Sequence, residues 1–310
     1  MTIKSNIKNI TTTQLKYIGV LVGGITAEVL GSQSEGMTPQ QITTRFGRVK
    51  SMPIGKRYTD DGEMTLVLAR HLAKNGSVKC QELHAEFGAI LGGRGYSQNT
   101  RKILQLFKDR PGIGAWLAPG NSSHNGSVMR ISPIGLMDWN SVQTMSAVRK
   151  AIYYTHSNSD DACYSSFLHC RLINALVTSR YKTKHDYFIY MMGHARRHAP
   201  LWAKMNLVRY CLNSPVQNIT AELLGDENVF QIKAIDAISC AVYIFFRFYE
   251  EPVEAVIYAA SLGGDTDTIA KLVGDLCGAL HGIKWIPPEW SKCEGEEEFT
   301  MLAQKLCVTK

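Results

Sequence analysis

Apolar residues recur at helical spacing along almost the whole chain, and this periodicity restricts the fold more than any other feature of the sequence. After Asp61, for example, Met64, Val67, Leu68 and Leu72 fall on one face of a helix. Sustained alternation of apolar and polar residues between hairpin turns, the pattern of strands, is not apparent. The chain is therefore predicted to be all-α. Helices are expected over residues 13–30, 63–74, 79–91, 98–108, 141–155, 160–180, 186–195, 200–212, 230–249, 252–262 and 268–281.

The chain length of 310 residues suffices for a substantial core, and no change of composition marks a linker. We expect a single domain over residues 1–310, in which residues 1–12 form a flexible N-terminus. Gly274, Gly278 and Gly282 recur every four residues in the last major predicted helix. A helix face without side chains would let a neighbouring helix approach closely.

The eight cysteines are scattered without a Cys-x-x-Cys pair, which is typical of reduced core residues in an intracellular protein. The amino terminus lacks the apolar core of a signal peptide. The most apolar stretch, residues 234–249, is interrupted by Asp236 and Arg247, and it should lie inside the assembly rather than in a membrane. We expect a cytoplasmic protein, with access to the nucleus left open.

The formal net charge is +7, and part of the basic surplus is concentrated over residues 180–209. Such a segment can contact nucleic acid, but no nucleic-acid motif and no regular basic-aromatic interleaving accompany it. A solvated helix face explains the charges better, so direct nucleic-acid binding is not expected.

Two acidic clusters stand near opposite ends of the chain, Thr59-Asp60-Asp61 and Gly263-Gly264-Asp265-Thr266-Asp267-Thr268. Carboxylates one or two positions apart do not share a helix face, so each cluster must lie where a loop enters a helix. N-capping alone would explain one side chain of each cluster, and both clusters hold more. Oxygen-only ligands suit magnesium, calcium or manganese rather than zinc. We therefore predict that the two clusters are halves of one metal site.

A long glycine- and polar-rich loop covers residues 110–127, and its backbone amides could cradle a diphosphate. His156 precedes a polar turn and is a second candidate, although a loop histidine is more often structural. The chain has no Walker phosphate loop, no dinucleotide fingerprint and no nucleophile elbow. His194 and His198 have the spacing of a zinc helix, but the glutamate of a metalloprotease helix is absent.

Five motifs occur in the order seen in the ADP-ribosylglycohydrolase family, which the chain resembles over residues 15–306. They are Tyr58-Thr59-Asp60-Asp61, Gly92-Gly93-Arg94-Gly95-Tyr96, Asn125-Gly126-Ser127-Val128-Met129-Arg130, Thr155-His156-Ser157 and Ser261-Leu262-Gly263-Gly264-Asp265-Thr266-Asp267-Thr268-Ile269. The last motif is the most specific. The tail with Pro288-Glu289-Trp290 is similar to the branch that acts on serine-linked and polymeric ADP-ribose and on O-acetyl-ADP-ribose.

The resemblance implies an orthogonal all-α bundle with a central cleft, in which two divalent cations, magnesium or alternatively manganese, lie at the foot of an ADP-ribose site. The metal ligands that it implies are Thr59, Asp60, Asp61, Asp265, Asp267 and Thr268. The implied substrate-binding residues are Gly93, Asn121, Ser122, Ser123, His124, Asn125, Gly126, Ser127 and His156. Glu35 aligns with an acidic residue on a mobile entrance loop, and Asp61 or Asp265 would act as general acid or base. The implied partners are ADP-ribosylated proteins, bound by a monomer.

Two positions depart from the family pattern. Ala27-Glu28 stands where members usually have Gly-Asp, and Gly62 stands where they usually have threonine. Neither change removes an expected ligand, but both could loosen the surroundings of the ligands and weaken turnover. The alternatives are an ADP-ribose-binding protein without efficient chemistry and an enzyme specific for ADP-ribosylarginine. Retention of all six expected ligands favours the enzyme.

Overall fold

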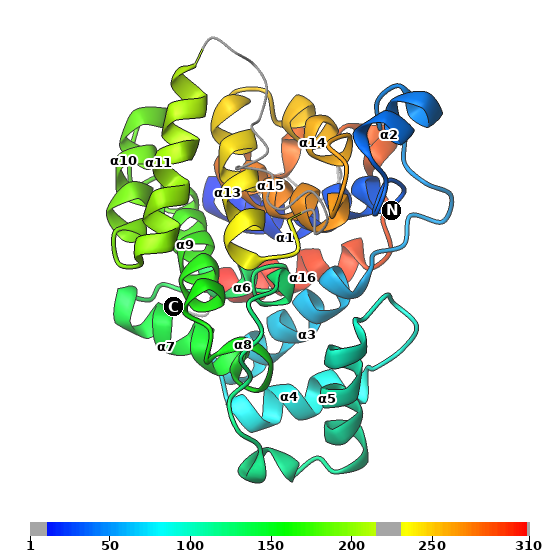
Figure 1. Ribbon diagram of the computed structural model, residues 1–310, viewed down its shortest axis with the longest axis vertical. Coiled ribbons are helices and arrows are strands. Elements are labelled where there is room, and N and C mark those ends of the chain that lie inside the picture. The colour runs from blue at the N-terminus through cyan, green and yellow to red at the C-terminus, as the bar shows by residue number, and fades with distance from the viewer. Residues whose placement is uncertain (1–10, 215–230, 309–310) are drawn as a thin grey trace.

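The computed structural model describes residues 11–214 and 231–308, and every regular element in these ranges is a helix (Figure 1). An isolated bridge between His124 and Lys233 is the one strand-like pairing there. The prediction of a single all-α domain is confirmed. Residues 1–10 of the expected flexible N-terminus lie outside the described residues, and Thr11 caps the first helix.

The α-helices are α1 (Thr12–Gly31), α2 (Pro39–Phe46), α3 (Asp60–Asn75), α4 (Cys80–Ala89), α5 (Gln98–Asp109), α6 (Ser132–Gly135), α7 (Ser141–Ala151), α8 (Tyr153–His156), α9 (Asp160–Val177), α10 (Lys184–Ala195), α11 (Ala199–Asn213), α13 (Ala234–Arg247), α14 (Pro252–Ala260), α15 (Thr266–His281) and α16 (Glu296–Val308). Short 3-10 helices are η3 (Ile113–Trp116), η4 (Asn125–Ser127), η5 (Ile283–Trp285) and η6 (Pro288–Trp290).

The centre of the fold is the crossing of α1 and α15, which pack against each other along most of their length (Figure 1). A β-carbon added at Gly278 would lie 1.9 Å from the carbonyl oxygen of Gly19, and one added at Gly274 would lie 2.4 Å from that of Gly23. The expected close approach at the glycine face is therefore confirmed. The same crossing places the last residue of α1, Gly31, against the start of α15.

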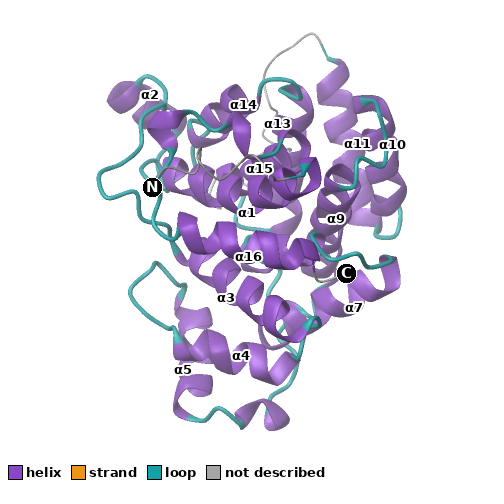
Figure 2. Cartoon of the chain, turned by 180° about the vertical axis from the view of Figure 1, so that it is seen from behind, coloured by secondary structure: helices purple, strands orange, loops and turns teal. Residues whose placement is uncertain are grey.

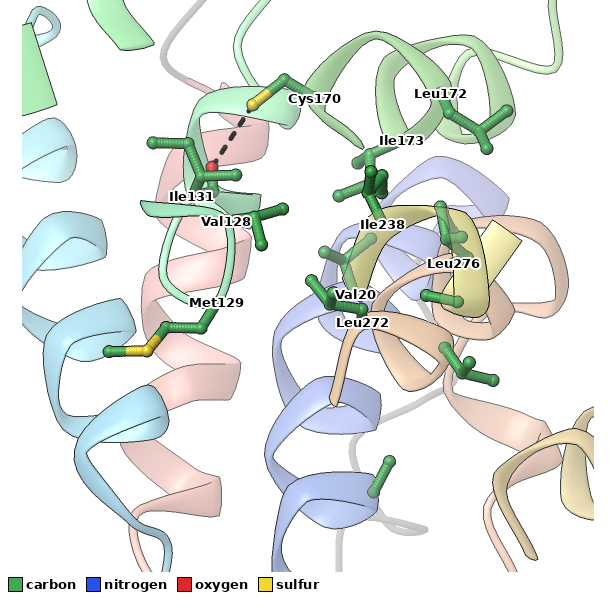
Figure 3. Close-up of a cluster of buried hydrophobic side chains, with 14 of the residues drawn as sticks. Val20, Val128, Met129, Ile131, Cys170, Leu172, Ile173, Ile238, Leu272 and Leu276 are labelled. Atoms are coloured by element: carbon green, nitrogen blue, oxygen red, sulfur yellow. Dashed lines mark hydrogen bonds between the residues drawn. The ribbon is translucent and has the colours of Figure 1, made fainter. Parts of the chain in front are cut away.

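The hydrophobic core surrounds this crossing. Val20 of α1, Leu272 of α15, Ile238 of α13 and Ile173 of α9 meet within it (Figure 3). Residues 234–246 of α13 are all buried, as the apolar stretch predicted. All eight cysteines lie among the described residues and carry free thiols. No helix in the described ranges is long and apolar enough to cross a membrane.

The remaining helices form layers around the core. Helices α10 and α11 cover α9 and α13 on one side, and α4 with α5 lies at the far end, beyond α3 (Figure 1). The last helix, α16, runs between α1 and α3 when the molecule is seen from behind (Figure 2). It thereby holds the start of α3 close to the centre of the fold.

Several helix boundaries differ from the predicted ones. The segment expected as one helix over 141–155 breaks at Ile152 into α7 and α8, and the helix expected over 160–180 ends at Val177. The start of the helix expected over 230–249 includes residue 230, which lies outside the described residues, and α13 begins at Ala234. Helices α2, α6 and α16 are not among the predicted ones.

Candidate metal centre and substrate loop

The first acidic cluster lies at the N-terminus of α3. Thr59 is the N-cap residue with extended backbone, so Asp60 and Asp61 occupy the first two helical positions. The Thr59 hydroxyl accepts only a long hydrogen bond, 3.4 Å, from the backbone N–H of Asp61. Thr59 thus fills the N-cap position, and Asp61, which follows in the first turn, is 3% exposed.

The second acidic cluster lies at the N-terminus of α15, behind a turn that requires glycine. Gly263 and Gly264 have φ values of +90° and +81°, a region that side chains disfavour. The turn places Asp265 at the N-cap and Asp267 in the first turn of α15. Asp267 uses its Oδ1 atom to accept the Thr268 N–H at 2.9 Å, which leaves Oδ2 for another partner.

The structure brings the two clusters together. The Thr268 hydroxyl donates to Asp61 Oδ2 at 3.0 Å, and Thr59 Oγ1 lies 3.4 Å from Asp267 Oδ2. Four of the six expected ligands are thus in direct contact across the two helix N-termini. The partners are more than 200 residues apart in the sequence, so the α1–α15 crossing and the packing of α3 create the site.

Glu35 joins this cluster from the loop after α1. Its carboxylate lies with those of Asp265 and Asp267 in a group whose ligand atoms are within 4.8 Å of one another. The loop is tied to the glycine turn, because Gly36 N donates to Gly264 O at 2.8 Å and Gly264 N donates to Met37 O at 2.9 Å. Glu35 itself is exposed, so it stands at the rim of the cluster.

The crowded carboxylates raise one another's pKa values. Burial, and then the charge of Asp267, raise the pKa of Asp60 to about 7. The charge of Asp267, followed by burial, raises the pKa of Glu35 to about 7. The pKa values of Asp61 and Asp267 lie well above the usual range, chiefly because both groups are buried.

Such an arrangement needs positive charge, and its donor atoms are carboxylate and hydroxyl oxygens. Hard divalent cations prefer this donor set, and a bound cation would relieve the repulsion that raises the pKa values. The residues present therefore fit the divalent metal that the two acidic motifs predict.

The polar loop lies against the second cluster. Asn125 Nδ2 donates to Asp265 Oδ2, and the backbone N–H of Asn125 donates to Ile232 O at 2.7 Å. Behind it, a β-carbon added at Gly126 would lie 3.2–3.3 Å from the His156 ring. Asn125, Gly126 and His156 thus lie together beside Asp265.

His156 is buried and held neutral, because burial and then the nearby Arg130 charge lower its pKa well below the usual range. Arg130 donates to the carbonyl of Gly126 and, at 2.9 Å, to the hydroxyl of Thr155. This buried guanidinium joins the two segments of the loop site. It also places a positive charge behind the backbone of the polar loop.

The rest of the expected substrate loop runs alongside the segment that leads to His156. Gly120 N donates to Tyr153 O at 2.9 Å, and Ser122 N donates to Thr155 O at 3.2 Å. Residues 121–124 are partly or fully exposed, with Ser123 O accepting from Ala234 N at 2.9 Å. Ser127, which follows Gly126, is buried.

Gly93 differs from the other expected site residues. It lies exposed in the loop between α4 and α5, and a β-carbon there would meet open space. Its neighbour Gly95 approaches the acidic cluster instead, because a β-carbon at Gly95 would lie 3.3 Å from Asp60 Oδ1. The loop motif therefore borders the cluster through Gly95.

Gln231 takes part in the site although no sequence pattern singles it out. It is buried, and its φ of +57° is rare for a residue with a side chain. Its Oε1 accepts from Asp265 N at 3.3 Å, and its carbonyl accepts from Asn125 Nδ2 at 3.2 Å. Gln231 thus links the polar loop to the acidic turn.

Comparison with known proteins agrees with this geometry. A family model described as ADP-ribosylglycohydrolase matches residues 10–309. Human ADP-ribosylhydrolase ARH3 is 25% identical, and the matched region covers 94% of this chain and 92% of that protein. The ADP-ribosyl-(dinitrogen reductase) glycohydrolase of Rhodospirillum rubrum is 23% identical, with 89% of this chain and 88% of that protein covered.

A solved structure described as an ADP-ribosylglycohydrolase-related protein complex shares the fold. It has a TM-score of 0.74 at 22% identity and covers 97% of this chain and 99% of its own. The match of the family model extends over nearly all the helices described above, including those that carry both acidic clusters. The chain therefore belongs to the ADP-ribosylglycohydrolase family of metal-dependent hydrolases, and it is an enzyme of that class.

Proposed function

We propose that this enzyme releases ADP-ribose from modified protein side chains, with serine-linked ADP-ribose preferred, and from poly(ADP-ribose) or O-acetyl-ADP-ribose. The observation that carries the proposal is the contact between the two acidic clusters, with the polar loop directly beside Asp265. We further propose that the enzyme acts as a monomer with two divalent cations, magnesium or alternatively manganese. The six ligands would be Thr59, Asp60, Asp61, Asp265, Asp267 and Thr268.

The bond that must break is a glycosidic bond at the anomeric carbon of ribose, and its cleavage develops positive charge on the sugar. Bound divalent cations would supply Lewis-acid stabilisation and orient the ribose hydroxyls. Asp61 and Asp265 are the candidates for moving the proton of the attacking water.

The contacts of Asp61 and Asp265 leave each able to take this role. Asp61 accepts from Thr268 through Oδ2, and Asp265 accepts from Asn125 through Oδ2. A carboxylate oxygen can accept more than one contact, so each residue can still bind water or a cation. Glu35 stands at the exposed rim, where it can contact the leaving group or close over the sugar.

The polar loop is suited to the diphosphate. Neutral His156 can donate a hydrogen bond, and the buried Arg130 charge behind Gly126 attracts an anion. The loop and the acidic cluster meet at Asn125. The diphosphate and the distal ribose would therefore lie side by side, one on the loop and the other over the carboxylates.

The preference for serine-linked substrate is based on the tail. Trp290 is buried and donates from Nε1 to Lys50 O at 2.9 Å. Arg94 and Glu294 form a bidentate ion pair, in which both N–O distances are 2.8 Å. Arg94 also donates a hydrogen bond to the carbonyl of Tyr58. The tail therefore braces the residue that precedes Thr59, and the preference itself follows from the resemblance of the tail to the serine and polymer branch.

One panel of substrates tests the function. Purified enzyme is given serine-linked, arginine-linked and O-acetyl-linked ADP-ribose, with magnesium or with chelator, and free ADP-ribose is measured. We expect release from the serine-linked substrate to exceed release from the arginine-linked one, and chelator to abolish both. Preferential cleavage of ADP-ribosylarginine would refute the substrate preference. Tight binding of ADP-ribose without any release would identify a binding protein instead.

A further inference from the structure

Glu28 is a buried carboxylate that contacts the N-terminus of α3 without belonging to either acidic cluster. It lies near the end of α1 and is 0% exposed. Its Oε1 atom accepts three hydrogen bonds, from Thr59 N at 2.6 Å, from Thr59 Oγ1 at 2.8 Å and from Gly62 N at 3.1 Å. A single oxygen of α1 thus binds both the N-cap residue and the third residue of α3.

These contacts make Glu28 the cap of a helix in another part of the chain. The first N–H groups of a helix lack intrahelical partners, and the N-cap side chain normally accepts one from the second or third residue. Here the N–H of the third residue, Gly62, is bound by Glu28. Because α1 supplies this acceptor, the carboxylates of Asp60 and Asp61 are not needed for capping.

Glu28 also fixes the direction of the Thr59 hydroxyl. That hydroxyl has one proton, and its acceptors are Glu28 Oε1 at 2.8 Å and Asp267 Oδ2 at 3.4 Å. The shorter contact holds the proton on the Glu28 side. The oxygen lone pairs of Thr59 then face the cluster, which is the orientation that a cation requires of a hydroxyl ligand.

Gly62 leaves the space that this arrangement needs. A β-carbon at position 62 would lie 2.9 Å from Glu28 Oε2 and 2.8 Å from Tyr58 Cβ. Glu28 Oε2 is buried and has no hydrogen-bond partner among the described residues. A larger residue at position 62 would therefore push the carboxylate away from Thr59, with no other bond to hold it.

We propose that Glu28 and Gly62 act as one steric and hydrogen-bonding pair that positions Thr59 and the first turn of α3 for cation binding. Glu28 is a positioning residue, since it acts through Thr59 and Gly62. The inference rests on the proposed function, because Thr59 is a ligand only if the acidic cluster binds a divalent cation.

The test is the binding of Mn²⁺ to the full chain by calorimetry, without any ADP-ribose. Glu28→Asp shortens the side chain by one methylene and withdraws the acceptor, and Gly62→Ala displaces it. Each variant should bind Mn²⁺ about 10- to 100-fold more weakly, the usual effect of losing a group that orients a ligand. In the variant that carries both changes, the shorter carboxylate side chain makes room for the new methyl group. The double variant should therefore lose less Mn²⁺ affinity than the product of the two single fold-losses.

A matched control separates the loss of positioning from general destabilisation of the fold. Val29 follows Glu28 in α1 and is also 0% exposed, so Val29→Ala should lower the unfolding temperature of the metal-free protein and leave Mn²⁺ affinity unchanged. An equal loss of Mn²⁺ affinity in Val29→Ala would overturn the proposal, as would wild-type affinity in Glu28→Asp. Wild-type protein that binds no Mn²⁺ would instead overturn the metal centre, and with it the proposed function.

Discussion

At the scale of single residues, the site depends on which oxygen atoms are left over after each helix N-terminus is capped. In α15, Asp267 Oδ1 binds the Thr268 N–H and Oδ2 faces Thr59. In α3, Glu28 binds the Gly62 N–H, so that both aspartates that follow Thr59 remain available. Each cluster therefore holds more oxygen atoms than capping requires, as the sequence predicts. The surplus consists of carboxylate atoms that point across to the other helix.

A buried histidine away from the carboxylates allows a prediction on pH. His84 is 0% exposed, and its ring packs among Phe87, Phe107 and Tyr154. Burial is the largest of the causes that lower its pKa from 6.5 to about 3. In the unfolded chain the imidazole takes up a proton below about pH 6.5, while in the folded chain it stays neutral. Its contribution to stability is therefore present above pH 6.5 and is lost as the pH falls toward 3.

We expect His84→Phe to remove one contribution that destabilises the fold in acid, so that the slope of the free energy of unfolding against pH is smaller in the variant than in wild type. One proton fewer taken up on unfolding corresponds to a slope smaller by about 1.4 kcal/mol per pH unit. Urea unfolding of both proteins at about one to two pH units below the ordinary histidine pKa measures the two slopes. Identical slopes would show that His84 is protonated in the folded state.

At the scale of elements, the α1–α15 crossing determines where the site forms, and glycine makes the crossing possible. The backbones meet where Gly19 and Gly278 face each other, and the start of α15 is thereby brought to the end of α1. The recurrence of Gly274, Gly278 and Gly282 at intervals of four residues predicted a close contact. The prediction did not name α1 as the partner, although Gly19 and Gly23 of α1 are also four residues apart and Gly31 follows eight residues later.

Gly278→Ala should destabilise the protein strongly. Its new β-carbon would lie 1.9 Å from the carbonyl oxygen of Gly19, a backbone atom that cannot move without shifting α1. We expect a loss of about 2 kcal/mol or more in the free energy of unfolding. The matched control is Gly193→Ala in α10, where a β-carbon meets open space, and this change should add about 0.5–1 kcal/mol. Urea unfolding compares the two, and equal effects would contradict the close-contact interpretation.

The helices that the sequence did not predict show what periodicity misses. Helix α2 buries only Ile42, and its apolar face consists of Ile42 and the partly buried Phe46, which is too short a pattern to detect. Helix α16 does have one, because Phe299, Ala303 and Leu306 are buried at helical spacing. Three glutamates in its first turn gave the tail an acidic composition. Negatively charged side chains in the first turn also stabilise a helix, because they interact favourably with the positive end of its dipole.

At the scale of the whole molecule, the site is assembled from segments at both ends of the chain and from its middle. The ligand chemistry of the two acidic clusters was enough to predict that they meet. The roles of Glu28 and Gln231 were not predictable, because each depends on a contact between segments 31 to 106 residues apart. No local pattern specifies such contacts. They follow from the packing of α1, α3 and α15 as one body.

Because the proposed ligands join α3 to α15, a bound cation should stabilise the entire fold. A ligand that binds only the native state raises stability by an amount that grows with its concentration. We expect magnesium or manganese to raise the unfolding temperature of wild-type protein. Asp267→Asn should abolish this rise and remove glycohydrolase activity, since the side chain loses its charge but keeps its volume. The helical signal in circular dichroism should remain.

The metal-free proteins give the sharper comparison. Without a cation, Asp267 lies among other buried carboxylates, and its charge is the first cause of the raised pKa of Glu35. Removing that charge relieves repulsion, so metal-free Asp267→Asn should be at least as stable as metal-free wild type. The control is Asp160→Asn, which changes an exposed carboxylate in the first turn of α9 and its pair with Arg149. That variant should keep both the metal-dependent rise and the activity. A large loss of stability in metal-free Asp267→Asn would make Asp267 a structural residue, and an undiminished rise with magnesium would place the cation elsewhere.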